Sequence, residues 1–256
     1  MNDPLFDLAR SSVLVTGAGS GIGKAICTML DARGARVLVT DVDPDAAAAT
    51  AEELLPGGRC LGSMGLDVRD EAAAGDAVDA VVAAAGSLDV LVNNAGINFG
   101  NDVPAEALPL DTWQLVLGVN LTGPFVCSQA AARHMIPQGR GKIVNIASAS
   151  AAILPRLDRR FITAYSVSKA GVVMLTRTLG LQWARYGITV NAISPTYTDA
   201  GLIQRDEVRM NQMIHSSPFE RLGLTSDLEG AIVYLSSRAS DFMTGQNLLV
   251  DGGFSL

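Results

Sequence analysis

Short apolar runs alternate along the chain with longer, alanine-rich segments. Six runs are rich in valine, isoleucine and leucine, and apolar and polar residues do not alternate along them. This pattern is typical of parallel strands buried on both faces. They are SVLVTG (12–17), ARVLVTD (35–41), LDVLVNNAG (88–96), GKIVNIAS (141–148), GITVNAISP (187–195) and QNLLVDGG (246–253). The intervals between them are long enough for helices, so the pattern predicts strands joined by helical crossovers.

This alternation predicts a Rossmann-like α/β fold, a doubly wound parallel sheet with helices on both faces. The chain has 256 residues and no linker rich in proline, glycine or serine, so we expect residues 1–256 to form a single domain. Such sheets bind ligands at the carboxyl ends of their strands. The segment at about 196–220 follows a strand without forming a simple strand–helix unit, which favours a substrate lid.

Charge and residue types argue against several classes of function. The net charge is −7 and no run of lysine or arginine stands out, which disfavours a nucleic-acid partner. The first ten residues lack a basic region followed by an apolar run, and no uninterrupted apolar stretch reaches membrane-spanning length, so we expect a cytoplasmic protein without a membrane contact. Cys27, Cys60 and Cys127 are expected to be reduced core thiols. His134 and His215 are isolated, so no metal site is predicted.

A glycine-rich turn follows the first predicted strand and leads into a helical pattern. Its sequence, GAGSGIG at residues 17–23, places glycines at Gly17, Gly21 and Gly23. Glycines let the backbone approach a pyrophosphate closely, and the free N–H groups of the following helix attract its charge. The spacing is not G-x-G-x-x-G, and a tight turn without a ligand is the alternative. The strand–loop–helix context favours a dinucleotide, with Ser20 and Ile22 as further contacts.

The second predicted strand ends at Asp41, eighteen positions after Gly23. A carboxylate there can accept hydrogen bonds from the adenosine ribose and would repel a 2′-phosphate. Neither Val42 nor Ser20 supplies a cation to hold such a phosphate, so NAD is favoured over NADP. The alternative is that Asp41 only begins the turn DVDPD.

Several short motifs occur in order at these strand ends and helix starts. They are TGAGSGIG (16–23), DV (67–68), NNAG (93–96), Asn120, the serine of NIAS (148), YSVSK (165–169), the proline of ISP (195) and VDGG (250–253). Together they resemble the short-chain dehydrogenase/reductase family over nearly the whole chain. The nearest likeness is to its NAD-dependent polyol and sugar dehydrogenases.

Tyr165 and Lys169 lie one turn apart if YSVSK is helical, which brings a phenol beside an ammonium group. The resemblance implies that Tyr165 donates and accepts the proton, and that Lys169 also binds the nicotinamide ribose. An ordinary phenol titrates near 10, so a base near neutrality needs a pKa shift of about three units, or roughly 4 kcal/mol. We expect Lys169 and the positive ring of NAD⁺ to supply it. The alternative is a surface Tyr–Lys pair.

The resemblance also implies that Ser148 holds the substrate oxygen. A serine that only bonds backbone is the alternative, and Ser150 is a nearby competitor for this role. Asn120 matches the family asparagine whose backbone carbonyl orders a water that links the lysine to solvent. Core polarity or a helix irregularity is the alternative for Asn120.

Further cofactor contacts carry over from the family's motifs. The resemblance implies Asp67 and Val68 near the adenine, Asn94, Ala95 and Gly96 near the ribose and pyrophosphate, and Pro195 beside the nicotinamide. The sequence departs from the family after this proline, where the usual glycine is Thr196 and a common threonine is Ala200. Thr198 is expected to take the carboxamide contact.

We therefore expect an NAD-dependent oxidoreductase that interconverts a secondary alcohol, of a polyol or sugar, and its ketone. Arg156, Arg159 and Arg160 could pair with a substrate carboxylate or only form a solvated turn. Two alternatives stay open: a 3-oxoacyl-thioester reductase, which usually carries a basic residue for NADP that is missing here, and a non-catalytic dinucleotide-binding scaffold. The closing residues NLLVDGGFSL resemble the family's last strand and tail, which implies a homotetramer.

Overall fold

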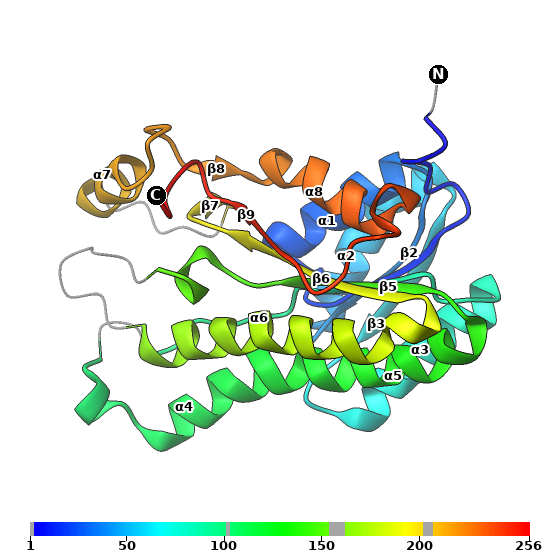
Figure 1. The fold of residues 1–256 in the computed structure, drawn as a ribbon, viewed down its shortest axis with the longest axis horizontal. Coiled ribbons are helices and arrows are strands. Elements are labelled where there is room, and N and C mark those ends of the chain that lie inside the picture. Colours follow the sequence, from blue (N-terminus) through cyan, green and yellow to red (C-terminus); the bar gives the residue numbers. More distant parts are fainter. Residues whose placement is uncertain (1–2, 101–102, 154–161, 202–206) are drawn as a thin grey trace.

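The computed structural model describes residues 3–100, 103–153, 162–201 and 207–256, and a sheet of seven parallel strands forms the centre of this part of the chain (Figure 1). The strands are β1 (Ser12–Val15), β2 (Arg36–Asp41), β3 (Cys60–Gly65), β4 (Val90–Asn93), β5 (Gly141–Ile146), β6 (Ile188–Pro195) and β9 (Asn247–Val250). They lie in the order β3-β2-β1-β4-β5-β6-β9. The order reverses between β1 and β4, which is the switch point where doubly wound sheets bind ligands.

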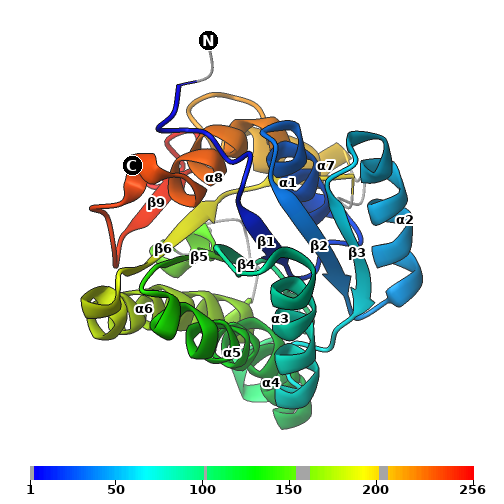
Figure 2. The same ribbon diagram turned by 90° about the vertical axis from the view of Figure 1, so that its right-hand side faces the viewer.

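Helices cover both faces of this sheet (Figure 2). One face carries α1 (Gly21–Ala32), α2 (Pro44–Leu54) and α8 (Glu229–Ser236). The other face carries α3 (Glu71–Ala85), α5 (Gly123–Gln138) and α6 (Thr163–Trp183), with α4 (Leu110–Leu117) on the same side. The predicted doubly wound parallel sheet with helices on both faces is confirmed.

Each strand of the sheet contributes to two apolar layers. Val13 and Val15 of β1 pack in one layer with Ile26 of α1, whereas Leu14 packs in the other layer with Ala131 of α5. Successive side chains of a strand point to opposite faces, so a strand covered on both faces is apolar throughout. The strands β1, β4 and β6 are buried at every residue, which explains their unbroken apolar runs.

All six predicted strands are present, and β3 is a further strand that the sequence pattern did not indicate. Its sequence, CLGSMG, is partly exposed along its whole length and pairs with β2 through an irregular register. This strand lies at the edge of the sheet. Because the side chains of β3 are only partly covered, this strand does not need the continuous apolar run of a strand buried on both faces.

The helical run Leu110–Gln138 joins α4, a π-helical turn at Gly118–Thr122, and α5. It is the one described helix whose length and mean hydropathy, 1.3 over its most apolar stretch, would suit a membrane span. Half of that stretch is buried inside the protein, where α5 packs on α3 and on the strands β4 and β5. These contacts make it a core helix of the fold.

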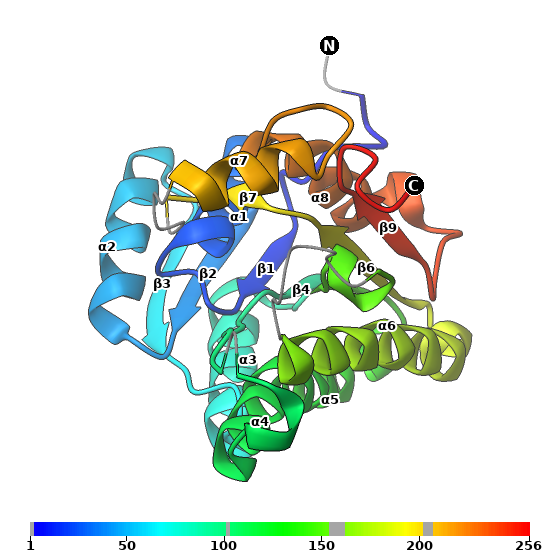
Figure 3. The ribbon, with the colours of Figure 1, turned by 90° about the vertical axis from the view of Figure 1, so that its left-hand side faces the viewer.

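After β6 the chain forms a small parallel pair of strands, β7 (Thr198–Asp199) and β8 (Gly223–Leu224), with α7 (Glu207–His215) between them in sequence. Figures 1 and 3 place α7 at the carboxyl end of the sheet, on the same side as α8. This excursion contains the segment 196–220 that was predicted as a lid, except that residues 202–206 lie outside the described part.

The three cysteines are free in the structure. Cys27 and Cys127 are buried, as expected for core thiols, whereas Cys60 is only half-buried. Burial raises the pKa of Cys27 and raises the pKa of Cys127 to about 12. Neither thiol is therefore a nucleophile near neutral pH. Among the described residues, no three histidine, cysteine or acidic side chains form a group that could hold a metal ion.

Candidate active site

A cleft of about 570 Å³ opens at the carboxyl ends of the strands, across the switch point between β1 and β4. The structure brings together here most of the residues that were predicted for the cofactor and the chemistry. They are Gly17, Ser20, Gly21, Ile22, Asp41, Asn94, Ala95, Gly96, Ser148, Tyr165, Lys169, Pro195 and Thr198. Lining residues follow the ends of five parallel strands, β1, β2, β4, β5 and β6, which explains how residues far apart in the sequence meet.

Helix α1 begins at the glycine loop without a side-chain cap. Its N-cap residue is Ser20. In the part of the chain that the structure describes, the Ser20 hydroxyl accepts no hydrogen bond from the first turn of the helix. That turn, GIGK, contains no acidic residue. In contrast, Asp43 caps α2 and Asp70 caps α3 by accepting hydrogen bonds from N–H groups of the next turn. The first N–H groups of α1 are therefore available to a ligand, at the positive end of the helix dipole. This helix start fits the pyrophosphate of a dinucleotide.

Two glycines of the loop have no room for a side chain. Gly17 has a φ of 61°, and a Cβ on it would lie 2.6 Å from the Cα of Ala95. A Cβ on Gly23 would lie 2.1 Å from the carbonyl oxygen of Gly17 and 2.4 Å from Nδ2 of Asn94. Asn94 donates from Nδ2 to the same carbonyl at 2.7 Å, which ties the loop to the turn after β4. The absence of a side chain at Gly23 thus allows the glycine loop and Asn94 to pack closely behind the cleft.

Asp41, at the end of β2, is half-buried and lines the cleft. Its carboxylate accepts hydrogen bonds from the N–H groups of Gly19 at 2.9 Å and Asp43 at 3.1 Å. Asp41 therefore does begin a turn, as the alternative interpretation had it, and it also supports the glycine loop. Its negative charge faces the cleft, while the next residue, Val42, is 71% exposed and uncharged.

Tyr165 and Lys169 lie one turn apart on α6, and both line the cleft. Lys169 is only 4% exposed, and its Nζ donates a hydrogen bond of 2.7 Å to the carbonyl oxygen of Ile146. The same Nζ lies 5.8 Å from the centre of the Tyr165 ring. The end of β5 therefore holds the ammonium group beside the phenol.

Burial raises the pKa of the Tyr165 phenol, a hydrogen bond with Ser148 lowers it, and the charge of Tyr197 adds to the rise. The net direction is upward, opposite to that expected for a base near neutrality. Burial also lowers the pKa of Lys169 to about 8, so its ammonium form still predominates at pH 7. We expected Lys169 to lower the pKa of Tyr165. A hydrogen bond with Ser148 lowers this pKa in the structure, and the effect of Lys169 stays a prediction.

Ser148 follows β5 and lines the cleft, and its side chain is hydrogen-bonded to Tyr165. Ser150 lies in the 3-10 turn Ala149–Ala151. It donates to the Ser148 Oγ atom from its N–H group at 3.2 Å and from its hydroxyl at 2.9 Å. The structure therefore places Ser148, rather than Ser150, next to the phenol.

Asn120 is fully buried in the π-helical turn Gly118–Thr122. Its Oδ1 atom accepts from the N–H of Ile97 at 2.8 Å, and its Nδ2 atom donates to the carbonyl of Ile97 at 2.9 Å and to Ser168 Oγ at 3.1 Å. Asn120 therefore joins the turn after β4 to α6 behind the cleft. The helix irregularity named as an alternative is present, and such turns frequently mark functional sites.

Besides Gly23, the predicted cofactor residues Asp67 and Val68 lie away from the lining of the cleft in the described part of the chain. Asp67 is bound by Arg69, whose Nε donates to Oδ1 at 2.9 Å, and this bond lowers the pKa of Asp67. Val68 is buried, and its side chain fills the space beside Gly123. Their adenine contacts stay predictions. Arg156, Arg159 and Arg160, for which substrate pairing and a solvated turn were both left open, lie outside the described residues.

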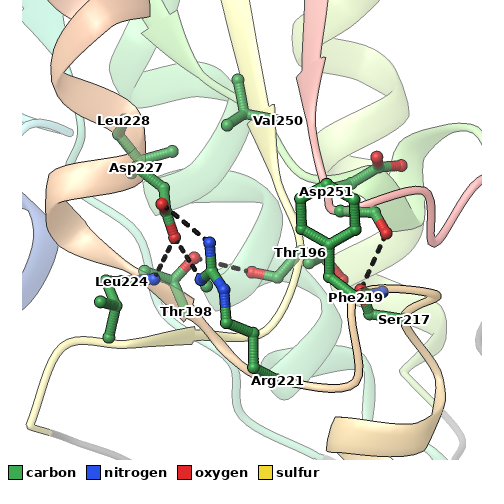
Figure 4. Close-up of a pocket in the computed structure, with 12 residues that line it drawn as sticks. Thr196, Thr198, Ser217, Phe219, Arg221, Leu224, Asp227, Leu228, Val250 and Asp251 are labelled. Carbon is green, nitrogen blue, oxygen red and sulfur yellow. Dashed lines mark hydrogen bonds and ion pairs between the residues drawn. The ribbon is translucent and has the colours of Figure 1, made fainter.

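A smaller pocket of about 200 Å³ adjoins the cleft at Thr196 and Thr198 (Figure 4). Figure 4 shows the guanidinium of Arg221 forked onto the carboxylate of Asp227, with N–O distances of 2.6 and 3.0 Å. Asp227 also accepts a hydrogen bond of 2.8 Å from the N–H of Leu224 in β8. Because β8 pairs with β7, this ion pair anchors the small sheet that carries Thr198 into the wall of the cleft.

Known proteins resemble this chain over nearly its whole length. A family model described as "Enoyl-(Acyl carrier protein) reductase" matches residues 17–255. The gluconate 5-dehydrogenase of Gluconobacter oxydans (strain 621H) is 36% identical over 255 residues, which cover 98% of this chain and 97% of the relative. The chain belongs to the short-chain dehydrogenase/reductase family.

Two further members of the short-chain dehydrogenase/reductase family show the same extent of similarity. The D-threitol dehydrogenase of Mycolicibacterium smegmatis is 37% identical over 253 residues, covering 98% of this chain and 95% of the relative. The crystal structure of a gluconate 5-dehydrogenase from Burkholderia cenocepacia J2315, in complex with NADP and tartrate, matches with a TM-score of 0.90, 37% identity and 98% coverage of both chains. As a member of this family, the chain is an oxidoreductase that acts on CH–OH groups with a dinucleotide cofactor.

Some lining residues of this dehydrogenase/reductase were not singled out as cofactor or catalytic residues from the sequence. They are Ile97, Asn98, Ile146, Ala147, Thr196 and Ala200. Each lies at or just after the end of β4, β5 or β6. The rule that ligands bind at the carboxyl ends of parallel strands would have found them if it had been applied to whole turns instead of single motif residues.

Proposed function

We propose that this short-chain dehydrogenase/reductase is NAD-dependent and interconverts a secondary alcohol, of a polyol or sugar, and its ketone. One observation carries the proposal: Ser148, Tyr165 and Lys169 line the same cleft as the uncapped start of α1. A single cleft thus combines a pyrophosphate site with groups that can hold an oxygen and move its proton, as a dehydrogenase requires.

The residues of the cleft have separate roles in the reaction. A bound dinucleotide supplies the acceptor for the hydride of the carbinol carbon. Ser148 donates a hydrogen bond to the substrate oxygen and holds it near Tyr165. Tyr165, as phenolate, takes the hydroxyl proton, and in the reverse direction it returns that proton to the carbonyl oxygen. The buried ammonium of Lys169, beside the phenol ring, stabilises the phenolate.

We assign NAD rather than NADP because of the charges in the cleft. Asp41 is negative, and Lys169, on the far wall at α6, is the one cation among the described lining residues. A 2′-phosphate at the end of β2 would therefore meet a carboxylate without a compensating guanidinium or ammonium group. The relative from Burkholderia cenocepacia was solved with NADP, so the preference of this chain must be measured.

The assignment of cofactor and substrate class can be tested in one assay. The absorbance of reduced nicotinamide is followed while the protein is offered NAD⁺ or NADP⁺ with polyols, sugars, sugar acids and 3-hydroxyacyl thioesters. We expect the highest kcat/KM with NAD⁺ and a polyol or sugar compound, since the relatives are named for gluconate and D-threitol. Turnover of thioesters alone would contradict the proposal and favour a 3-oxoacyl-thioester reductase. Binding of NAD without turnover of any compound would favour a non-catalytic scaffold.

We also propose that residues 196–220 form the substrate lid. Thr196, Thr198 and Ala200, at the start of this segment, form part of the cleft wall. The helix α7 follows them at the same end of the sheet (Figure 3). A segment in that position can cover a substrate held at Tyr165.

We further propose a cytoplasmic homotetramer. Val167, Met174 and Leu181 recur at seven-residue spacing along α6, and they are 45%, 58% and 83% exposed. Residues at this spacing lie on one side of a helix, and an exposed apolar stripe of this kind is buried when helices of two subunits associate. Sedimentation equilibrium tests the assembly, and a monomer at micromolar concentration would contradict it.

A further inference from the structure

Ser150 lies behind the Ser148 hydroxyl, in the 3-10 turn that follows β5. It makes two hydrogen bonds to one atom, because both its N–H group and its hydroxyl donate to Ser148 Oγ, at 3.2 and 2.9 Å. Ser150 itself is not among the described residues that line the cleft. Its contact with the reaction is therefore indirect and passes through Ser148.

The number of hydrogen bonds that a serine hydroxyl can make determines whether Ser148 donates or accepts toward the cleft. A hydroxyl has one proton to donate and two lone pairs that accept. The two bonds from Ser150 occupy both acceptor positions of Ser148. The Ser148 proton is then left to be donated, and Tyr165 is the cleft residue to which Ser148 is hydrogen-bonded.

We propose that Ser150 is a positioning residue that makes Ser148 a one-way hydrogen-bond donor toward Tyr165 and the substrate oxygen. The proposal rests on the dehydrogenase function proposed above and assigns a role to a residue outside the cleft. A donor stabilises an oxygen that carries negative charge, such as the phenolate of Tyr165 or the developing charge on the substrate oxygen. A neutral phenol, in contrast, needs an acceptor for its own proton.

Removal of the Ser150 hydroxyl frees one acceptor position on Ser148. Ser148 can then accept a hydrogen bond from the neutral phenol, which favours the protonated form and raises the pKa of Tyr165. Alcohol oxidation requires the phenolate, so the acid limb of the pH profile of kcat/KM moves to higher pH. The expected shift, for one neutral hydrogen bond, is about half a unit to one unit.

The experiment compares the pH profiles of the parent, Ser150→Ala, Ser150→Thr and Ser237→Ala at saturating NAD⁺ with the best alcohol. Threonine retains the hydroxyl and should restore the parent profile. Ser237→Ala is the matched control, because it removes a serine hydroxyl that donates to the carbonyl of Tyr234, outside the lining of the cleft. It should leave the acid limb in place. If Ser150→Ala does not fold, Ser150→Cys replaces it, since a thiol is a much weaker donor.

An upward shift in Ser150→Ala that is reversed in Ser150→Thr supports the proposal. An unchanged acid limb in Ser150→Ala overturns it, and so does an equal shift in Ser237→Ala. A second readout needs no turnover: the ultraviolet absorbance of tyrosinate is titrated with and without NAD⁺, and the signal of Tyr165→Phe is subtracted. If this titration shifts as expected while the parent oxidises no alcohol, the proposed function fails and the role of Ser150 stands.

Discussion

The two walls of the cleft are built from different chemical groups. The cofactor wall, formed by residues 17–23 and the ends of β2 and β4, presents glycines, backbone N–H groups and the carboxylate of Asp41. The catalytic wall, formed by the end of β5 and the start of α6, presents the side chains of Ser148, Tyr165 and Lys169. Adding a side chain should displace the backbone that forms the cofactor wall. Removing a functional group should instead impair the catalytic wall, which acts through its side chains. Cofactor binding and turnover should therefore respond to different substitutions.

The two walls also differ in how favourable each is for a charged group. The first N–H groups of α1 are left without a side-chain cap in the described loop, so the cofactor wall is ready for an anion. On the catalytic wall, burial opposes charge, since it raises the pKa of Tyr165 and lowers the pKa of Lys169 to about 8. The phenol therefore needs a further positive charge to ionise near neutral pH.

Among substitutions in the cofactor wall, the largest effect is expected from Gly23→Ala. The new Cβ would lie 2.1 Å from the carbonyl oxygen of Gly17, so the loop must move. Overpacking of this kind costs about 1–3 kcal/mol, and a displaced loop should weaken NAD binding by roughly 100-fold. Fluorescence titration of NAD measures this loss.

The matched control for that substitution is Gly75→Ala, in the interior of α3. A Cβ on Gly75 would meet no described atom within 4 Å, and alanine favours a helix over glycine by about 1 kcal/mol. This variant should bind NAD as the parent does and be slightly more stable. If the Gly23→Ala and Gly75→Ala variants bind NAD with equal affinity, our account of the cofactor wall is wrong.

A smaller effect is expected from Asp41→Asn, which retains an acceptor for the N–H of Gly19 but removes the negative charge. Loss of repulsion toward a 2′-phosphate should reduce the preference for NAD over NADP by about tenfold. The ratio of the two kcat/KM values measures this preference. Asp43→Asn, at the cap of α2, should leave the ratio unchanged. A ratio that stays at the parent value in Asp41→Asn would refute our account of cofactor choice.

The last effect concerns the stability of the folded protein instead of cofactor binding, and it depends on Lys169. The pKa of Lys169 is lowered from 10.5 to about 8 by burial, so between these pH values the unfolded chain binds more protons than the folded one. The stability of the parent relative to Lys169→Met should therefore rise from about pH 8 to pH 10.5, by at most about 1.4 kcal/mol per pH unit. Urea unfolding of both proteins measures the difference. A difference that falls over this range would contradict the burial of the ammonium group.

The sequence was sufficient to predict the fold and most of the cleft. Buried parallel strands carry unbroken apolar runs, and Asp41, Ser148 and Pro195 could be placed because they end such strands. The edge strand β3 was not predicted, because an edge strand needs no such run. Two properties of the site could not be predicted from the sequence and became visible only in the structure. The two bonds from Ser150 depend on the local 3-10 turn, and the raised pKa of Tyr165 depends on burial by distant elements.

The central claim is that Tyr165 moves the proton of an alcohol bound against the cofactor wall. Tyr165→Phe tests it most directly, because this change removes one oxygen atom from the catalytic wall and leaves the cofactor wall intact. We expect kcat for the best alcohol to fall by on the order of 1,000-fold while the Kd for NAD stays at the parent value. Oxidation by Tyr165→Phe at the parent rate, with normal NAD binding, would contradict the account.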